Sequence, residues 1–187
     1  MAEQKIVLVG VNQKETPVEI RERLAFTQSK IEDSIERLVG FEEIAEHIIL
    51  STCNRVEIYA RVRNHEEGIN FIKKFIGDFH GISLEVLDQY FYCYRDHQAV
   101  EHLFKVSSSL DSMVLGEAQI LGQVKDAYGM AKTYSATGVV LNQLFEKACK
   151  FKCPLGPFQT LPSNSGIGLK SEALTVINLL SPIQNDS

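Results

Sequence analysis

Hydrophobic and polar positions along the chain follow two alternating patterns, and together these predict strands separated by helices. Short apolar runs rich in valine, isoleucine and aromatic residues are typical of strands, whereas apolar residues spaced three or four apart are typical of one helix face. The runs predict strands at 5–11, 47–51, 56–62 and 91–95.

The predicted helices start at recognisable residues. Thr16 followed by Pro17 predicts a helix start, because threonine is a good cap and proline is tolerated at the first helical position. Ser29 and Glu32 have the spacing of a capping box, and Asp96 is expected to cap a later helix. The helix after Ser29 is expected to bury Ile31, Ile35, Leu38 and Val39. Further helices are predicted at 66–80, at 84–90, from Glu117 onward and at 139–151.

This order of elements, β-α-α-β-β-α-α-β and then helices, predicts an α+β fold. We expect a ferredoxin-like split βαβ sandwich of about four antiparallel strands, followed by helices and an irregular C-terminal tail. Helical periodicity stops after Phe151, and the remaining residues hold four of the five prolines but only four charged residues. A domain is therefore expected over 1–151 and a poorly structured tail over 152–187.

Composition and short motifs argue against several classes of protein and several kinds of site. The net charge of −5 lacks the basic character of a nucleic-acid-binding protein, so any RNA contact must come from a local patch. No apolar run suits a signal peptide or a membrane span, and a cytoplasmic protein is expected. The four cysteines do not have the spacing of a metal site, and we expect reduced thiols and no metal. The sequence GIG at 166–168 lacks the third glycine of a dinucleotide-binding motif.

The stretch LSTCNRVEIYA, residues 50–60, places Cys53 among polar neighbours where a strand ends. A free cysteine is commonly a small buried residue, which favours a structural role. Arg55, however, is a nearby cation that would lower the thiol pKa and favour the reactive thiolate. Arg55 is equally compatible with a surface residue that pairs with Glu57. These residues alone leave both interpretations of Cys53 open.

Two further features carry candidate chemistry. His102 lies in AVEHLF, although a lone histidine is more often a surface or core residue than a catalytic one. Gln119 and Gln123, in GEAQILGQVK, share a helix face and suit recognition of a polar substrate. The alternative is a solvated helix start, in which Glu117 interacts favourably with the helix dipole.

Taken together, three stretches resemble the N-terminal catalytic domain of the glutamyl-tRNA reductase family, which opens the five-carbon route to tetrapyrroles. They are VGVNQKETPVEIRERLAF, LSTCNRVEIYA and AVEHLFKVSSSLDSMVLGEAQILGQVKDAYGMA. The resemblance covers roughly residues 6–151 and implies a ferredoxin-like first domain, in agreement with the pattern above. The first stretch departs from the family's usual NHKTAP, because Gln13 and Glu15 replace a histidine and a threonine.

The resemblance implies a cysteine-dependent oxidoreductase. A thiolate attacks the glutamyl ester of glutamyl-tRNA(Glu) and forms a thioester, and NADPH then reduces it to glutamate-1-semialdehyde for porphyrin biosynthesis. On this resemblance Cys53 is the nucleophile and His102 assists proton transfer. Arg55 would bind a substrate carboxylate. The positions matching the family's substrate-binding residues are Thr52, Asn54, Arg55, Ser112, Glu117, Ala118, Gln119 and Gln123.

The family also has a Rossmann NADPH-binding domain and a dimerisation domain, and this chain departs from the family pattern near Phe151. We expect a truncated or frame-shifted product or an incomplete gene model, with no cofactor-binding residues. The expected partners are glutamyl-tRNA, a second copy in the family's homodimer and the downstream aminomutase. The chain alone is not expected to complete the reduction. The alternatives are a slow glutamyl-tRNA esterase and a non-enzymatic or vestigial binding module.

Overall fold

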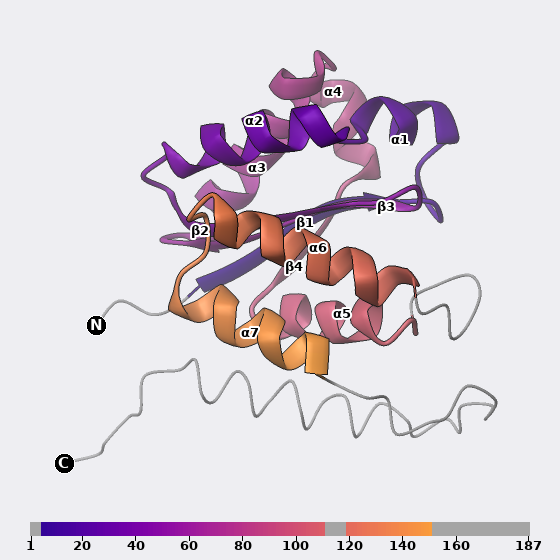
Figure 1. The fold of residues 1–187 in the computed structure, drawn as a ribbon. Coiled ribbons are helices and arrows are strands. Elements are labelled where there is room, and N and C mark those ends of the chain that lie inside the picture. Colours follow the sequence, from indigo (N-terminus) through magenta and orange to yellow (C-terminus); the bar gives the residue numbers. More distant parts are fainter. Residues whose placement is uncertain (1–4, 111–118, 151–187) are drawn as a thin grey trace.

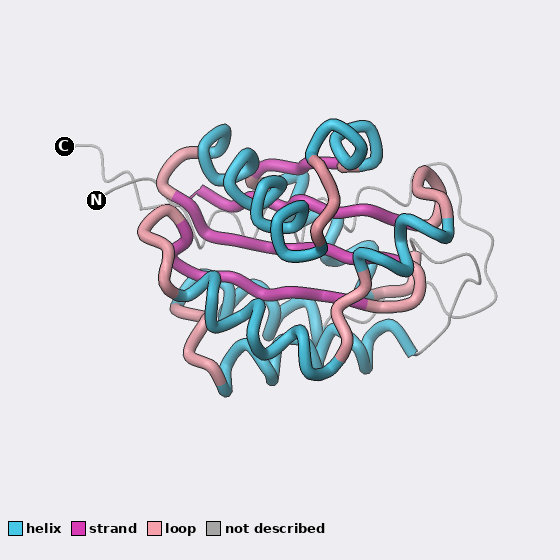
Figure 2. The backbone as a smooth tube through the Cα atoms, turned by 90° about the horizontal axis from the view of Figure 1, so that it is seen from above, coloured by secondary structure: helices cyan, strands magenta, loops and turns pink. Residues whose placement is uncertain are grey.

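One antiparallel sheet forms the centre of the protein, and a computed structural model describes its residues 5–110 and 119–150. The strand order is β2-β3-β1-β4, which is the order of a ferredoxin-like split βαβ sheet. Figures 1 and 2 show this sheet from two directions at right angles. The predicted fold class is therefore confirmed. The strands are β1 (Lys5–Asn12), β2 (Ile44–Ser51), β3 (Arg55–Val62) and β4 (Tyr92–Arg95).

Helices cover both faces of this sheet (Figure 1). One face carries α1 (Val18–Leu24), α2 (Gln28–Val39), α3 (His65–His80) and α4 (Leu84–Leu87), with a 3₁₀ turn at Asp88–Tyr90. The other face carries α5 (His97–Ser107), α6 (Gln119–Thr133) and α7 (Val139–Lys150). Within the described ranges, no helix has the length and apolar character needed to cross a membrane.

The two helical layers explain the burial pattern of the central strands. In β1, every residue from Ile6 to Val11 is buried, as expected for a strand covered on both faces. β3 is buried as completely, except at Arg61. The polar positions of its alternating sequence therefore lie inside the protein, where a charged side chain needs a partner.

The helix starts differ from those predicted. Pro17, not Thr16, is the N-cap residue of α1, and Thr27, not Ser29, is the N-cap residue of α2. Asp96 does precede α5, but its side chain does not cap this helix. Its Oδ1 instead accepts a hydrogen bond from the backbone N–H of Ile6 at 3.0 Å, which ties the start of α5 to β1.

The stripe predicted for α2 is correct at three of its four positions. Ile31, Ile35 and Leu38 are buried, whereas Val39 is 49% exposed. Val39 is the last residue of the helix, so the chain leaves the sheet surface before its side chain can be covered.

A buried carboxylate from β2 holds the start of α7. Glu46 Oε2 accepts hydrogen bonds from the backbone N–H groups of Gly138 at 2.9 Å and Leu141 at 2.8 Å. Arg61 Nε lies 2.8 Å from Glu46 Oε1 and balances its charge. A helix start presents N–H groups without helical partners and a partial positive charge, so a carboxylate is favourable there. A side chain on Gly138 would collide with Glu46, because its Cβ would lie 2.9 Å from the carboxylate carbon.

Candidate functional site

A tight turn between β2 and β3 carries the candidate nucleophile. The backbone N–H of Thr52 donates to the carbonyl oxygen of Arg55 at 2.8 Å and closes the turn. The Thr52 hydroxyl oxygen also accepts hydrogen bonds from the backbone N–H groups of Asn54 and Arg55, both at 3.1 Å. Thr52 is buried, whereas Cys53 is exposed at the tip of this turn.

Neighbouring segments also hold the backbone carbonyls of Cys53 and of the residue that follows it. Arg21 Nε, from α1, donates to the carbonyl oxygen of Cys53 at 2.9 Å. The backbone N–H of Gln13 donates to the carbonyl oxygen of Asn54 at 2.9 Å. Both contacts come from the stretch VGVNQKETPVEIRERLAF, so the segment that departs from the family pattern also holds the turn. Cys53 is thus an exposed thiol on a well-supported backbone.

The other described cysteines differ from Cys53 in their surroundings. Cys93 and Cys149 are half-buried, and this burial raises the pKa of each thiol. A raised pKa lowers the fraction of thiolate at neutral pH, and the thiolate is the nucleophilic form. Among the described residues, no group of three or more His, Cys, Asp or Glu side chains could hold a metal ion.

Arg55 begins β3 and forms a buried ion pair. Its Nη1 lies 2.9 Å from Glu57 Oε1, and the two side chains are 5% and 0% exposed. The alternative of a surface pair is therefore wrong in its location, although the pairing itself exists. An ion pair this deep requires further hydrogen bonds to offset its desolvation.

Those further bonds come from three aromatic or imidazole side chains. Glu57 Oε1 accepts a hydrogen bond from Tyr92 Oη at 2.6 Å, and His102 Nε2 lies 2.8 Å from the same oxygen. Glu57 Oε2 accepts from Tyr59 Oη at 2.7 Å. We call Arg55, Glu57, Tyr59, Tyr92 and His102 the Glu57 cluster. It joins β3, β4 and α5, and the Tyr59 ring packs against Phe145 of α7, so the cluster lies on the sheet face covered by α5–α7.

The electrostatics of this cluster keep Glu57 ionised. Burial raises the pKa of the Glu57 carboxyl, but the charges of His102 and Arg55 and the hydrogen bonds from His102 and Tyr92 outweigh it and lower this pKa to about 2. Burial, and next the Glu57 charge, raise the pKa of Tyr59 well above its ordinary value, so its hydroxyl remains a donor. The cluster is a carboxylate surrounded by donors at neutral pH.

A glycine on β1 makes room for the cluster. Gly10 lies opposite Glu57 in the β1–β3 register and opposite Tyr92 in the β1–β4 register. A Cβ at this position would lie 2.9 Å from Glu57 Cγ and 2.9 Å from the Tyr92 hydroxyl oxygen. Real Cβ atoms essentially never approach other heavy atoms so closely, so a larger residue must displace one of the two side chains.

Sequence reasoning did not predict Glu57, Tyr92 or Gly10 as site residues. The one signal for Glu57 was a carboxylate within an apolar strand run, next to Arg55. The other two depend on strand register, because Gly10, Glu57 and Tyr92 lie far apart in the sequence and meet only across three strands.

The remaining predicted site residues are only partly described. Gln119 is exposed and Gln123 half-buried near the start of α6, a helix that packs against α5. Ser112, Glu117 and Ala118 lie outside the described residues. The structure thus brings Arg55 and His102 together through Glu57, and it places Thr52, Cys53 and Asn54 in one turn.

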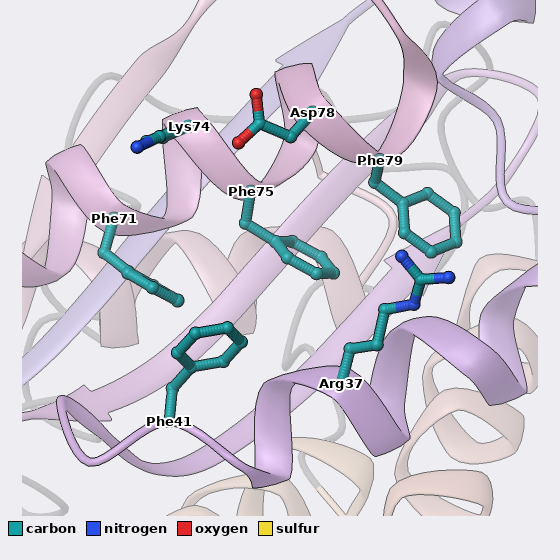
Figure 3. A pocket seen from close by; sticks show the side chains of 7 residues that line it. All are labelled: Arg37, Phe41, Phe71, Lys74, Phe75, Asp78 and Phe79. Atoms are coloured by element: carbon teal, nitrogen blue, oxygen red, sulfur yellow. The ribbon is translucent and has the colours of Figure 1, made fainter.

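A cavity of about 480 Å³ lies on the opposite face of the sheet. Three phenylalanine rings from α3 and one, Phe41, from the connection between α2 and β2 gather there, with charged side chains around them (Figure 3). None of the predicted site residues lines this phenylalanine cavity. Its lining residues are Arg37, Phe41, Phe71, Lys74, Phe75, Asp78 and Phe79.

The described residues do not fit the NADPH that the resemblance implies. A dinucleotide site of the Rossmann type needs a glycine-rich turn between a parallel strand and a helix. Every strand pair in the described part of the chain is antiparallel. The connection from β1 to α1 follows Asn12 with the residues QKETP and contains no glycine.

Comparison with known proteins agrees with this geometry. The family model described as glutamyl-tRNA(Glu) reductase, N-terminal domain, matches residues 9–152. Glutamyl-tRNA reductase of Pelobacter propionicus is 50% identical over 143 residues, which are 76% of this chain and 33% of that protein. The Prochlorococcus marinus protein of the same name is 46% identical over the same share of each chain.

A solved structure of glutamyl-tRNA reductase from Methanopyrus kandleri has a TM-score of 0.62 and 31% identity, and it covers 78% of this chain and 32% of that one. The chain therefore spans about a third of the length of the relatives it matches. With most of its residues inside the family model and an antiparallel sheet shared with a solved member, the chain belongs to the glutamyl-tRNA reductase family, in the region of its N-terminal domain.

Proposed function

We propose that this chain carries out the acyl-transfer step of glutamyl-tRNA reduction. The Cys53 thiolate attacks the ester carbonyl carbon, the bond from that carbon to the tRNA 3′ oxygen breaks, and glutamate remains on sulfur as a thioester. The leaving oxygen takes up a proton and departs as the tRNA 3′ hydroxyl. The observation that carries the proposal is an exposed Cys53 in a turn whose backbone carbonyls are held by neighbouring segments.

The other predicted residues take supporting roles in this proposal. Thr52 holds the turn, and Asn54 and Arg55 line the glutamate site beside it. Arg55 binds a carboxylate of the substrate while Glu57 balances its charge, and His102 exchanges protons with the reacting groups. Substrate contacts are also proposed for Ser112, Glu117, Ala118, Gln119 and Gln123 on the family resemblance.

For the longer proteins of the family, the proposal extends to reduction of the thioester by NADPH, with release of glutamate-1-semialdehyde for tetrapyrrole biosynthesis. A homodimer and transfer of the product to an aminomutase belong to that extended proposal. The described residues of this chain offer no fit to NADPH, so the step proposed for the chain itself ends at the thioester. Water then releases glutamate slowly from Cys53, which is the esterase alternative.

The exposure of Cys53 supports this proposal over a non-enzymatic binding module, for which an inert and buried thiol is the expectation. Thiol labelling separates the two directly. We expect Cys53 to react with a small alkylating reagent faster than Cys93 and Cys149, because their burial raises their pKa.

The decisive experiment uses tRNA charged with radiolabelled glutamate. The chain is mixed with it, and the label bound to protein and the label released to solution are measured over time. We expect protein-bound label in the wild-type chain and in Cys93→Ser, a control at a half-buried thiol, and none in Cys53→Ser. Equal deacylation by the wild type and Cys53→Ser would overturn the proposal. Semialdehyde formation by the chain with NADPH would overturn its restriction to acyl transfer.

A further inference from the structure

We infer that Glu57 is a positioning residue: its buried carboxylate holds His102 with the proton on Nε2, so that Nδ1 is the nitrogen that exchanges protons with the substrate. The inference deepens the proposed function and rests on it for the role of His102. It stands on the geometry of the Glu57 cluster and on the space that Gly10 leaves for it.

The tautomer follows from the chemistry of the contact. Glu57 Oε1 and His102 Nε2 are 2.8 Å apart, both side chains are buried, and an ionised carboxylate can only accept hydrogen bonds. The buried ion pair with Arg55 and the hydroxyl donors of Tyr59 and Tyr92 keep Glu57 ionised near neutral pH. Nε2 must therefore carry a hydrogen, whether His102 is neutral or charged. In neutral His102 the lone pair that can accept a proton is then on Nδ1.

The carboxylate is itself held in one orientation. Arg55 and Tyr92 donate to the same oxygen as His102, and Tyr59 donates to the other oxygen. Rotation of the Glu57 carboxylate would break several of these charge-assisted bonds at once. A fully buried carboxylate cannot replace them with water, so rotation is strongly disfavoured.

The imidazole ring is confined as well. The ring of Tyr94 lies 5.1 Å from the His102 ring between centroids, and the ring of Tyr92 lies 5.6 Å from it. These contacts restrict ring rotation, and Glu57 selects which nitrogen carries the hydrogen. The orientation and the tautomer of His102 therefore have separate physical causes.

Gly10 makes the geometry of the Glu57 cluster possible. Its missing side chain allows Tyr92 and Glu57 to meet across β1, since a Cβ there would lie 2.9 Å from atoms of both. Gly10→Ala would push these side chains apart while every polar group of the cluster stays in the sequence. This substitution tests positioning without deleting a charge or a hydrogen-bond donor.

Within the proposed function, neutral His102 then has one ring nitrogen, Nδ1, that can take up and return a proton. Nδ1 accepts the proton of the Cys53 thiol as the sulfur–carbon bond forms, and it returns that proton to the tRNA 3′ oxygen as the carbon–oxygen bond breaks. His102 ends the step in the state in which it began. Glu57 neither gains nor loses a proton and does not touch the substrate.

The test reads the tautomer of His102 by NMR, independently of activity. The chain is labelled with ¹⁵N-histidine, and two-bond and three-bond ¹H–¹⁵N correlations distinguish a hydrogen on Nε2 from one on Nδ1. The signal of His102 among the five histidines is assigned with His102→Gln. We expect the Nε2–H form in the neutral wild type and a substantial Nδ1–H fraction in Glu57→Gln. A wild type with the hydrogen on Nδ1, or an unchanged tautomer in Glu57→Gln, would overturn the inference.

Gly10→Ala provides a second variant that keeps every polar group. We expect it to shift the tautomer in the same direction as Glu57→Gln. Gly129→Ala on α6 is its matched control, because a Cβ there meets nothing within 4 Å, and it should leave the tautomer unchanged. If Glu57→Gln does not fold, as judged by circular dichroism, an unchanged tautomer in Gly10→Ala overturns the inference.

Kinetics separate this inference from the proposed function. Thioester formation should be about 100-fold slower in Glu57→Gln, at the lower end of effects seen for general acid–base groups. A wild type that has the Nε2–H tautomer but forms no thioester overturns the proposed function and leaves the placement of His102 intact. A thioester formed equally fast by the wild type and Glu57→Gln overturns the role of Glu57 alone.

Discussion

The two faces of the sheet differ in where they place charged side chains and in where they leave space. The side of the sheet with α2 and α3 holds the phenylalanine cavity. There Arg37 pairs with Asp33 at 3.0 Å on the surface, and the two side chains are 59% and 50% exposed. The face under α5–α7 holds the Glu57 cluster, in which a similar pair, Arg55 and Glu57, is buried and saturated with donors. The cavity lies among phenylalanine rings with charged side chains around them, whereas the cluster of the proposed site is filled by its own hydrogen bonds.

This difference separates the cavity from the proposed site, so cavity volume alone would not have led to the Glu57 cluster. Phenylalanine rings need no hydrogen-bond partners, so a cavity between them leaves no buried polar group unsatisfied. A buried charge must be surrounded by partners, which fill the space around it. The feature that marks the proposed site is therefore a buried pair of charges, Arg55 and Glu57. The exposed Cys53 lies in the turn that immediately precedes Arg55.

We expect the largest difference in stability between the two faces when the carboxylate of each ion pair is removed. Glu57→Ala leaves the Arg55 guanidinium buried without its carboxylate, and the free energy of unfolding should fall by about 3–5 kcal/mol. Asp33→Ala removes the same kind of group from Arg37 on the other face and should cost about 0.5 kcal/mol at most, because that pair is in water. Urea unfolding of both variants measures the difference. Losses of similar size would break the contrast between the two faces.

A smaller effect should separate the faces by pH. His47, which faces α2, is buried, and this burial lowers its pKa to about 4, against a smaller opposing effect of a hydrogen bond with the backbone of Ile35. The unfolded chain takes up this proton below about pH 6.5, so the free energy of unfolding should fall by up to about 3 kcal/mol as pH decreases from 6.5 to 4. The Glu57 pKa is lowered instead, so its contribution is complete above about pH 4.5 and is lost only toward pH 2.

Urea unfolding at several pH values tests the His47 prediction. His47→Gln has no group that takes up a proton here, so its stability should change less between pH 6.5 and 4 than that of the wild type. His97→Gln is the control, because His97 is exposed at the start of α5, and it should keep the wild-type pH dependence. Identical pH profiles for the wild type and His47→Gln would remove His47 as the acid-sensitive group.

A further effect, smaller than those of Glu57→Ala and of pH, is expected in the phenylalanine cavity. Phe41 is 40% exposed and its ring centroid lies 4.5 Å from that of Phe71. Phe41→Ala should lower the free energy of unfolding by about 1 kcal/mol, the value of one aromatic pair, and should leave thioester formation unchanged. Urea unfolding and the labelled-tRNA assay measure the two quantities. A loss of thioester formation without a loss of stability would connect the two faces and sharpen the comparison.

The sequence predicted the parts of the fold that depend on local pattern. The four strands follow from their apolar runs, and their interleaving with helices is enough for a ferredoxin-like sheet. The helix starts at Thr16 and Ser29 were misplaced by one and two residues, because several residues at each start suit a cap and propensity does not decide among them.

The candidate site was predictable where its residues share a motif and unpredictable where they meet through the sheet. Thr52, Cys53, Asn54 and Arg55 form one turn and one short segment of sequence. Glu57 alternates with apolar residues and looks like a solvent-facing position, but the second helical layer buries it. Gly10 gains its meaning only from its strand partners, Glu57 and Tyr92.

The contact between Glu46 and α7 has a geometric consequence for Cys53, the proposed nucleophile. Glu46 lies near the start of β2, about 17 Å along the extended strand from its last residue, Ser51, and Cys53 follows in the turn. The Glu46 carboxylate accepts hydrogen bonds at the first turn of α7, so β2 positions that helix. The same strand leads directly into the turn that contains Cys53. The distance between the first turn of α7 and the Cys53 turn is therefore set by β2, a strand that pairs with β3.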